Sequence, residues 1–159
     1  MSGVVAIVLA DRASGILRRP RQLARCRGTT LLRAIAREAC ASSCDRVAVV
    51  LGAASGLIAP TLDGLDVELI KSPHWRDGVA SSIGAGVAWA EASGADAAIL
   101  CSCDLPELDA AHLDRLIGAY HASGAAVASY DGHALGAPAL WPRCSSPTVT
   151  SRSGSSRRR

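Results

Sequence analysis

The stretch VVAIVLADRASGILRRPRQL, from Val4 to Leu23, carries the strongest indication of the fold. Its first part, Val4 to Ala10, is apolar and rich in β-branched side chains, as strands are when a parallel sheet buries them on both faces. Charge begins at Asp11, and the loop that follows stands where α/β nucleotide-binding proteins place a phosphate-binding turn. Its only glycine is Gly15, although glycine is what lets a backbone approach a phosphate closely.

Positive charge is concentrated around this loop. The formal net charge is +3, but residues 144–159 hold four arginines and no acidic residue, which leaves 13 basic and 14 acidic side chains elsewhere. Six of those 13 lie in the loop or its flank: Arg12, Arg18, Arg19, Arg21, Arg25 and Arg27. This clustering favours a bound anion over a nucleic-acid surface. A solvated arginine-rich surface, or an ordinary strand-to-helix connection, explains it equally well.

Length and composition predict one globular domain. The chain has 159 residues, of which 49% are hydrophobic, and it has no Phe, so aliphatic side chains must form the core. No apolar run reaches the ~20 residues of a membrane span, and the N-terminus lacks the features of a secretory signal. We therefore expect a cytoplasmic protein. Its cysteines lack zinc-site spacing and are interpreted as small buried thiols: Cys26, Cys40, Cys44, Cys101, Cys103 and Cys144.

Strand and helix patterns alternate along the chain. Strands are predicted at Val4–Ala10, Arg46–Leu51, Asp66–Lys71, Ala97–Cys101, Ala125–Tyr130 and Ala137–Trp141, and helices at Thr29–Ala41, Gly78–Ser93 and Asp109–Ser123. This order predicts a three-layer α/β fold with a mostly parallel sheet. We expect the domain to span residues 1–143 and residues 144–159 to be a disordered Ser/Arg-rich tail. No helix is predicted after the last strand, so the fold is expected to be truncated at its C-terminus.

A second candidate segment is SPHWRDGVASSIGAGVA, from Ser72 to Ala88. Gly78 precedes a helix start that combines free N–H donors with the hydroxyls of Ser81 and Ser82, an arrangement that favours a ligand with hydrogen-bond acceptors. Glycine is unfavourable inside helices, so Gly84 and Gly86 indicate close approach by the sheet or by a ligand. Tight packing alone explains the glycines better than it explains the serines.

The third segment is CDLPEL, Cys103–Leu108. Asp104 comes directly after a predicted buried strand, and the Leu-Pro that follows turns the chain away. Its carboxylate is therefore expected at the carboxyl edge of the sheet, where Mg²⁺ can be held by one or two carboxylates together with water and phosphate oxygens. The alternative is that Asp104 caps its own turn. The presence of the other two candidate segments favours the metal site over this alternative.

These segments resemble the MobA-like nucleotidyltransferase family, and particularly its molybdenum cofactor cytidylyltransferase branch. The pattern of that branch includes G-x-T-L-L, N-P-x-W-x-x-G-M-x-S-S-I-x-A-G, L-C-D-Q-P-x-L and a late G-x-P. In the matching places this chain has GTTLLRAI (28–35), SPHWRDGVASSIGAG (72–86), CDLPEL (103–108) and GAPALW (136–141). The resemblance covers nearly all of residues 4–143, and the long motif is its most specific part.

The resemblance implies a Rossmann-like nucleotidyltransferase that binds CTP or GTP with Mg²⁺. A phosphate of the acceptor, molybdopterin in that branch, would attack the α-phosphorus and release pyrophosphate during molybdenum cofactor maturation, with a molybdoenzyme or its maturation chaperone as a further partner. Neither nucleic acid nor a membrane is an expected partner. By position, Asp104 would be the metal ligand and Arg21 the catalytic cation. Nucleotide-binding positions would be Ala10, Asp11, Arg12, Ser14, Arg21, Gly78, Ser81 and Ser82.

The opening loop departs from the family pattern L-A-A-G-x-S-x-R-x-G-x-x-K. Small residues and an arginine of the pattern are replaced at Asp11, Arg12, Ile16 and Arg18. Arg21 keeps the charge of the pattern's lysine, but its planar guanidinium is not interchangeable with an ammonium at a tight phosphate site. The closing G-D-x-G is absent, so the tail offers no candidate for the carboxylate that would share the metal with Asp104.

Three interpretations therefore stay open. The first is a Mg²⁺-dependent nucleotidyltransferase. The second is a catalytically impaired homologue that acts as a nucleotide- or pterin-binding or partner module. The third is a gene product whose last segment is out of frame, which the Ser/Arg-rich ending allows.

Overall fold

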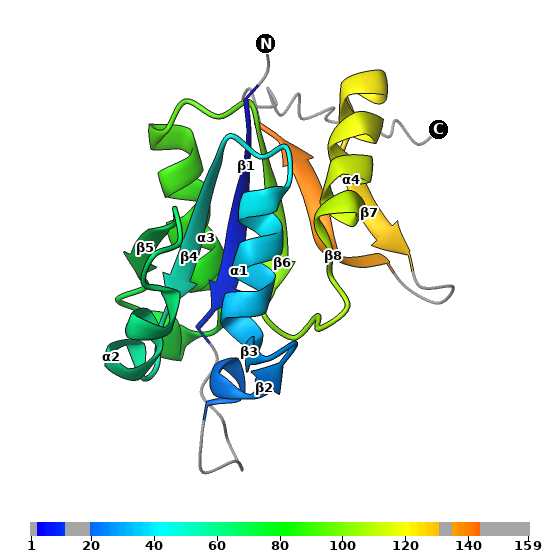
Figure 1. Ribbon diagram of the computed structural model, residues 1–159. Helices are drawn as coiled ribbons and strands as arrows, with labels where there is room; N and C mark the ends of the chain where they lie inside the picture. Colours follow the sequence, from blue (N-terminus) through cyan, green and yellow to red (C-terminus); the bar gives the residue numbers. More distant parts are fainter. Residues whose placement is uncertain (1–2, 12–19, 131–134, 144–159) are drawn as a thin grey trace, which may run out of the picture.

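The computed structural model describes residues 3–11, 20–130 and 135–143. Within this part, one sheet has the strand order β5-β4-β1-β6-β8-β7 (Figure 1). Its strands are β1 (Val4–Ala10), β4 (Arg46–Leu51), β5 (Glu68–Lys71), β6 (Ala97–Ser102), β7 (Val127–Tyr130) and β8 (Leu135–Pro142). Strands β5, β4, β1 and β6 are parallel, whereas β8 pairs antiparallel with both β6 and β7. The predicted mostly parallel sheet is confirmed.

Helices cover both faces of this sheet and make three layers (Figure 1). Helices α1 (Leu31–Ala41) and α4 (Ala110–Ser123) pack on one face and α3 (Val79–Ala92) on the other. Val4, Ala6 and Val8 of β1 face the first layer, while Val5 and Ile7 face α3. Both faces of β1 are thus buried, which is why its sequence is a continuous apolar run rather than an alternating one.

Short elements lie between the main ones. They are the 3₁₀ helices η1 (Arg21–Leu23), η2 (Ala59–Leu62) and η3 (Trp75–Asp77), the short helix α2 (Ser55–Ile58), and the strands β2 (Arg25–Cys26) and β3 (Thr29–Thr30). Strands β2 and β3 form a hairpin, so α1 begins at Leu31 instead of at the predicted Thr29. The predicted threonine cap is Thr30, whose hydroxyl accepts a hydrogen bond from the backbone N–H of Arg33 at 3.3 Å.

The two glycines predicted to mark close approach on α3 differ from each other. A Cβ on Gly86 would lie 2.6 Å from Cγ2 of Ile7, whereas one on Gly84 would meet no atom within 4 Å. Close packing on the sheet therefore explains Gly86. It does not explain Gly84, which is exposed.

The prediction of small buried thiols holds for Cys101 and Cys103, whereas Cys26, Cys40 and Cys44 are only partly buried. Cys144 lies outside the described residues. Burial raises the pKa of Cys101 to about 12. In the part of the chain that the structure describes, no helix has the length and apolar character needed to cross a membrane.

Candidate functional site

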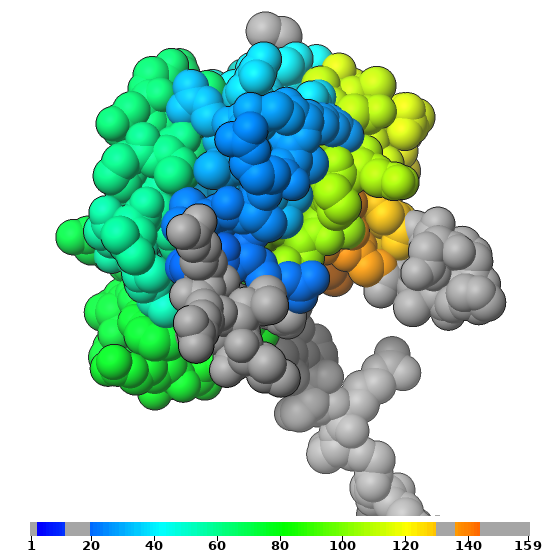
Figure 2. All heavy atoms as spheres, turned by 60° about the horizontal axis from the view of Figure 1, so that its bottom comes forward, coloured from blue at the N-terminus to red at the C-terminus, as the bar shows by residue number. Residues whose placement is uncertain are grey.

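The segments singled out in the sequence follow the carboxyl ends of parallel strands. Because β1, β4, β5 and β6 are parallel, their carboxyl ends lie at one edge of the sheet, the lower edge in Figure 1. Figure 2 views this edge and shows the segment that contains η1, in blue, beside the yellow-green segment that follows β6. Ligands of open α/β sheets bind at this edge.

Asp104 lies where the sequence predicts it, just beyond β6. The backbone N–H of Cys103 donates to the carbonyl of Leu9 at 3.2 Å, which extends the pairing of β6 with β1 by one residue. The N–H of Asp104 donates to the hydroxyl of Ser102 at 3.2 Å. The turn thus starts from a fixed point, and the Asp104 side chain keeps 23% of its surface exposed at the sheet edge.

Arg21 faces this carboxylate from another part of the chain. Its Nε lies 3.8 Å from Oδ1 of Asp104, and its side chain is 63% exposed. This separation is that of an ion pair rather than of a hydrogen bond. The structure therefore brings together the two residues that the sequence predicts to be catalytic.

Gln22, a residue that the sequence analysis did not single out, anchors η1. Its side chain is buried, and its Nε2 donates to the carbonyl of Ala10 at 3.1 Å. The contact ties η1 to the end of β1 and so fixes where Arg21 stands. Nothing in the sequence around Gln22 predicts this hydrogen bond, because a glutamine next to an arginine in a charged loop is normally expected at the surface.

The end of β1 is packed tightly against the end of β4. Ala10 is fully buried, Asp11 is 5% exposed, and the carbonyl of Asp11 accepts a hydrogen bond from Ala53 at 3.4 Å. A Cβ on Gly52 would lie 2.7 Å from that carbonyl oxygen and 2.8 Å from Cβ of Trp75. Glycine is thus required at position 52, where the sequence alone indicates only a turn. The predicted positions Arg12 and Ser14 lie outside the described residues.

The predicted positions at the start of α3 are placed differently from one another. Gly78 has φ 111°, a conformation that side chains disfavour, and it precedes the first helical residue. The Ser81 hydroxyl lies 2.5 Å from the carbonyl of His74 and 3.0 Å from that of Gly78, so it closes the turn. Ser82 is fully buried, and its hydroxyl has no hydrogen-bond partner among the described residues. Gly78 and Ser81 lie at the surface of this edge, whereas Ser82 faces the interior.

The donor set at the carboxyl edge fits one hard cation held in part by substrate. A carboxylate oxygen is the ligand type that Mg²⁺ prefers, and Mg²⁺ commonly takes one or two carboxylates with water and phosphate oxygens. Among the described residues, no three His, Cys, Asp or Glu side chains gather to hold a metal by themselves. In this part of the chain Asp104 is the predicted metal ligand, and a bound triphosphate and water would supply further ligands.

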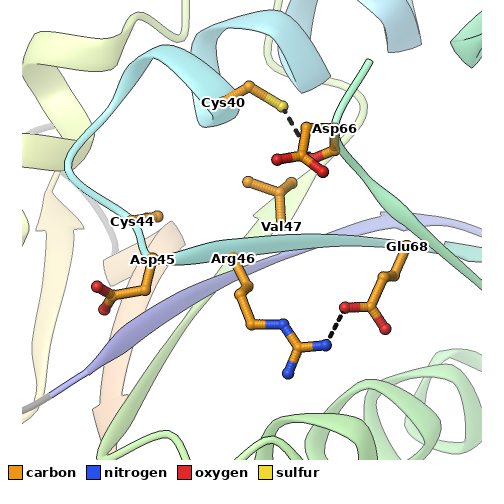
Figure 3. Close-up of a pocket in the computed structure, with 7 residues that line it drawn as sticks. All are labelled: Cys40, Cys44, Asp45, Arg46, Val47, Asp66 and Glu68. Atoms are coloured by element: carbon orange, nitrogen blue, oxygen red, sulfur yellow. Dashed lines mark hydrogen bonds and ion pairs between the residues drawn. The ribbon is translucent and has the colours of Figure 1, made fainter. Parts of the chain in front are cut away.

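The opposite, amino edge of the sheet has a small cavity of about 120 Å³ (Figure 3). Its lining residues are Cys40, Cys44, Asp45, Arg46, Val47, Asp66 and Glu68. Glu68 pairs with Arg46 and accepts a hydrogen bond from Nε1 of Trp89 at 2.9 Å. Burial raises the pKa of both Cys40 and Cys44, so these thiols are poor nucleophiles at neutral pH.

Comparisons with known proteins agree with the fold and the motifs. The sequence profile of the MobA-like NTP transferase domain matches residues 6–159, while no curated protein sequence matches the chain significantly. The crystal structure of Rv0371c from Mycobacterium tuberculosis H37Rv has a TM-score of 0.74 and 26% identity over 89% of this chain and 73% of that one. A second structure of Rv0371c, a complex with manganese, has a TM-score of 0.67 and 25% identity over 89% and 72% of the two chains.

A nucleotidyl transferase from Methanothermobacter has a TM-score of 0.72 at 21% identity, over 88% of this chain and 71% of that one. At this identity the similarity shows the fold alone. The profile match is stronger evidence because it covers most of the chain, including the segments that carry Arg21 and Asp104. The chain belongs to the MobA-like NTP transferase family.

Proposed function

We propose that the chain transfers a nucleoside monophosphate from CTP or GTP to a phosphate-bearing acceptor such as molybdopterin, with release of pyrophosphate. The observation that carries the proposal is the 3.8 Å ion pair between Arg21 and Asp104 at the carboxyl edge of the sheet. The two groups come from segments far apart in the sequence and meet where this class of fold binds ligands. Family membership supports nucleotidyl transfer as the reaction class.

In this reaction an oxygen of the acceptor phosphate forms a bond to the α-phosphorus of the triphosphate. The bond from the α-phosphorus to the oxygen that bridges to the β-phosphate breaks, and its electron pair leaves with pyrophosphate. The protein has to align the two reactants and neutralise charge, and these two effects account for most catalysis of phosphoryl and nucleotidyl transfer. Arg21 is suited to the second task because its guanidinium presents several N–H donors to phosphate oxygens.

Asp104 would hold Mg²⁺ against the triphosphate. When bound, the ion supplies positive charge that stabilises the leaving pyrophosphate. The manganese complex of the related Rv0371c supports a divalent cation in this family. Asp104 is the one carboxylate that the resemblance assigns to the metal among the described residues. Phosphate oxygens of the nucleotide would supply further ligands, so we expect metal and nucleotide to bind cooperatively.

The nucleotide and acceptor sites are assigned by resemblance and by position at the edge. The nucleotide would contact Asp11, Arg12, Ser14, Arg21, Gly78 and Ser81. Ala10 and Ser82 are fully buried, so their side chains are not counted among these contacts. The four motifs shared with the molybdenum cofactor cytidylyltransferases favour CTP and a molybdopterin acceptor, and the product would pass in the cytoplasm to a molybdoenzyme or its maturation chaperone.

A pyrophosphate-release assay tests the proposal. CTP, GTP, ATP and UTP are each incubated with the chain and molybdopterin, with and without Mg²⁺. We expect release from CTP or GTP that requires both Mg²⁺ and acceptor and is lost in Asp104→Ala. Absence of turnover above background with every nucleotide would refute the transferase.

A catalytically impaired, nucleotide- or pterin-binding homologue is the second candidate. It is favoured by Asp11, which occupies an almost fully buried position where the family pattern has alanine, and by Arg12 and Arg18, which stand where the pattern has glycine. Calorimetry separates the two. Tight, Mg²⁺-dependent CTP binding supports the transferase, while acceptor binding without Mg²⁺-dependent nucleotide binding supports the second candidate.

A further inference from the structure

Arg27 adopts a backbone conformation that is unusual for arginine. It and Gly28 are the two residues of the turn between β2 and β3, with φ of 49° and 78°. A two-residue hairpin turn with positive φ at both positions favours Asn, Asp or Gly, and a longer side chain in the left-handed region costs roughly 1 kcal/mol. Residues held in such conformations often serve a function that offsets the cost.

The Arg27 side chain bridges three segments. Its Nη1 lies 3.2 Å from Oε1 of Glu38 on α1 and donates to the carbonyl of Leu108 at 3.3 Å. The other carboxylate oxygen of Glu38, Oε2, accepts a hydrogen bond from the N–H of Ala110, the first residue of α4, at 3.0 Å. We call Arg27 and Glu38 the clamp. It ties the β2–β3 turn and α1 to the segment between β6 and α4.

That segment carries Asp104. At its start, Cys103 is bonded to the carbonyl of Leu9 on β1, and at its end Leu108 and Ala110 are bonded to the clamp. Asp104 is thus held between two fixed points. Leu108 also packs in the core, so the clamp adds polar contacts to an end of the segment that apolar packing holds as well.

Arg27 of the clamp lies six residues after Arg21 in the sequence. The hairpin that follows Arg21 is closed onto the start of α1 by a hydrogen bond from the backbone N–H of Leu31 to the carbonyl of Ala24 at 2.7 Å. Gln22 fixes one end of this stretch to β1, and Arg27 fixes the other end to the Asp104 segment. The spacing between the Arg21 and Asp104 side chains is therefore set from both sides.

We propose that Arg27 and Glu38 are positioning residues that hold the Asp104 segment at the distance from Arg21 needed to bind a metal–triphosphate. The inference rests on the proposed function, because it names what the clamp serves. Neither residue needs to touch the substrate. Their effect passes through Leu108 and Ala110 to the carboxylate of Asp104.

The test compares Arg27→Asn with Arg33→Gln. Asparagine suits the turn, so Arg27→Asn removes the bridge without destabilising the hairpin. Arg33 on α1 also donates to two backbone carbonyls, of Thr61 and Asp63, but on the side of α1 that faces η2, so Arg33→Gln is the matched control. Glu38→Gln and the conservative Arg27→Lys complete the set.

Three quantities are measured on the full chain: amide hydrogen exchange in residues 103–112, the affinity for Mn²⁺ in the presence of CTP, and the Mg²⁺ concentration that gives half-maximal turnover. For Arg27→Asn and Glu38→Gln we expect faster hydrogen exchange in that segment. The affinity for Mn²⁺ should fall roughly tenfold, and the Mg²⁺ concentration for half-maximal turnover should rise by a similar factor, as is usual when residues that orient a metal ligand are changed. The melting temperature of Arg27→Asn stays at or above that of wild type. Arg27→Lys recovers part of the metal affinity, and Arg33→Gln changes none of the three.

Faster exchange with unchanged metal affinity would overturn the proposal, because the clamp would then be only a structural contact. Unchanged exchange in residues 103–112 would also overturn it. If wild type binds Mn²⁺–CTP but does not turn over, the transferase assignment fails while exchange and affinity still decide the role of the clamp. If wild type binds no metal at all, both proposals fall.

Discussion

At the amino edge of the sheet, charged side chains make hydrogen bonds and ion pairs with other parts of the protein. Asp45 accepts a hydrogen bond from the N–H of Val4 at 2.8 Å, and Glu68 is bonded by Trp89 and paired with Arg46, whose guanidinium lies 5.4 Å from the Trp89 ring. At the carboxyl edge, by contrast, Arg21 keeps 63% of its side chain exposed and lies 3.8 Å from Asp104. Both pairs are partly exposed, 47% and 48% for Arg46 and Glu68 against 63% and 23% for Arg21 and Asp104. The difference lies in the contacts, because Glu68 also accepts the hydrogen bond from Trp89 and has a fixed place in the fold.

The difference shows why a cavity with charged walls is not by itself a site. The cavity of the amino edge is lined by three acidic residues, Asp45, Asp66 and Glu68, but two of these carboxylates already serve backbone or side-chain donors. A ligand there would have to compete with contacts that stabilise the fold. At the carboxyl edge the proposed triphosphate would meet a cation, Arg21, and a carboxylate, Asp104, on two separate segments.

The largest effect is expected for the carboxylate of Asp104. In Asp104→Asn we expect kcat/KM for nucleotidyl transfer to fall by roughly 10²- to 10³-fold, the loss typical of removing one group that stabilises transition-state charge. The matched change at the other edge, Asp66→Asn, leaves kcat/KM within about twofold of wild type because distant surface charges are screened. Steady-state kinetics measure both, and comparable losses in the two variants would erase the distinction between the edges.

A smaller effect is expected for Arg21. Arg21→Ala lowers kcat/KM by roughly ten- to a hundredfold, because one cation is lost from a site where the metal still neutralises charge. Arg21→Lys keeps the charge and retains more activity than Arg21→Ala. The control Arg46→Ala, at the amino edge, removes an equally charged side chain without lowering kcat/KM. Full activity in Arg21→Ala would remove Arg21 from the mechanism.

Gly84 and Gly86 of α3 allow the effect of packing on stability to be measured separately from any effect on catalysis. Gly86→Ala places a methyl 2.6 Å from Ile7 Cγ2, and overpacking of this kind lowers the free energy of unfolding by about 1–3 kcal/mol. Gly84→Ala meets open space and raises it by up to about 1 kcal/mol, since alanine favours helix. Urea unfolding measures both changes. The same sign in the two variants would contradict the contrast between the two positions.

The smallest effect concerns Glu68 at the amino edge. The hydrogen bond from Trp89 and the neighbouring Arg46 lower the pKa of Glu68 below 4.5 in the folded state. Its contribution to stability is therefore fully present above the unfolded pKa and is lost as the pH falls through the lowered folded value. Wild type should lose stability relative to Glu68→Gln as unfolding is measured from pH 6 down to about pH 3. If the free energies of unfolding of wild type and Glu68→Gln changed with pH in parallel, the contacts of Glu68 with Arg46 and Trp89 would not contribute to stability.

The sequence predicts best what depends on burial. The bounds of β1 and β4 match the predicted Val4–Ala10 and Arg46–Leu51, because a run of apolar residues ends where the sheet ends. Asp104 could be placed at the sheet edge for the same reason. Strand β5 begins at Glu68 instead of at the predicted Asp66, since polar strand ends carry little pattern.

Contacts between polar side chains of distant segments could not be predicted. The tie of Gln22 to Ala10 and the clamp of Arg27 and Glu38 join residues whose sequence neighbours give no periodic signal. The need for glycine at position 52 arises from the approach of Asp11 and Trp75, which only the folded chain brings together. Such contacts decide where Arg21 and Asp104 lie, so the sequence predicts candidate site residues but not their geometry.

Anomalous diffraction from crystals grown with Mn²⁺ and a non-hydrolysable CTP analogue tests the central claim most directly. The account predicts one strong manganese peak about 2.1 Å from a carboxylate oxygen of Asp104, with the triphosphate bridging from the ion to the guanidinium of Arg21. A peak among Asp45, Asp66 and Glu68 at the amino edge, or a triphosphate bound away from Arg21, would contradict it.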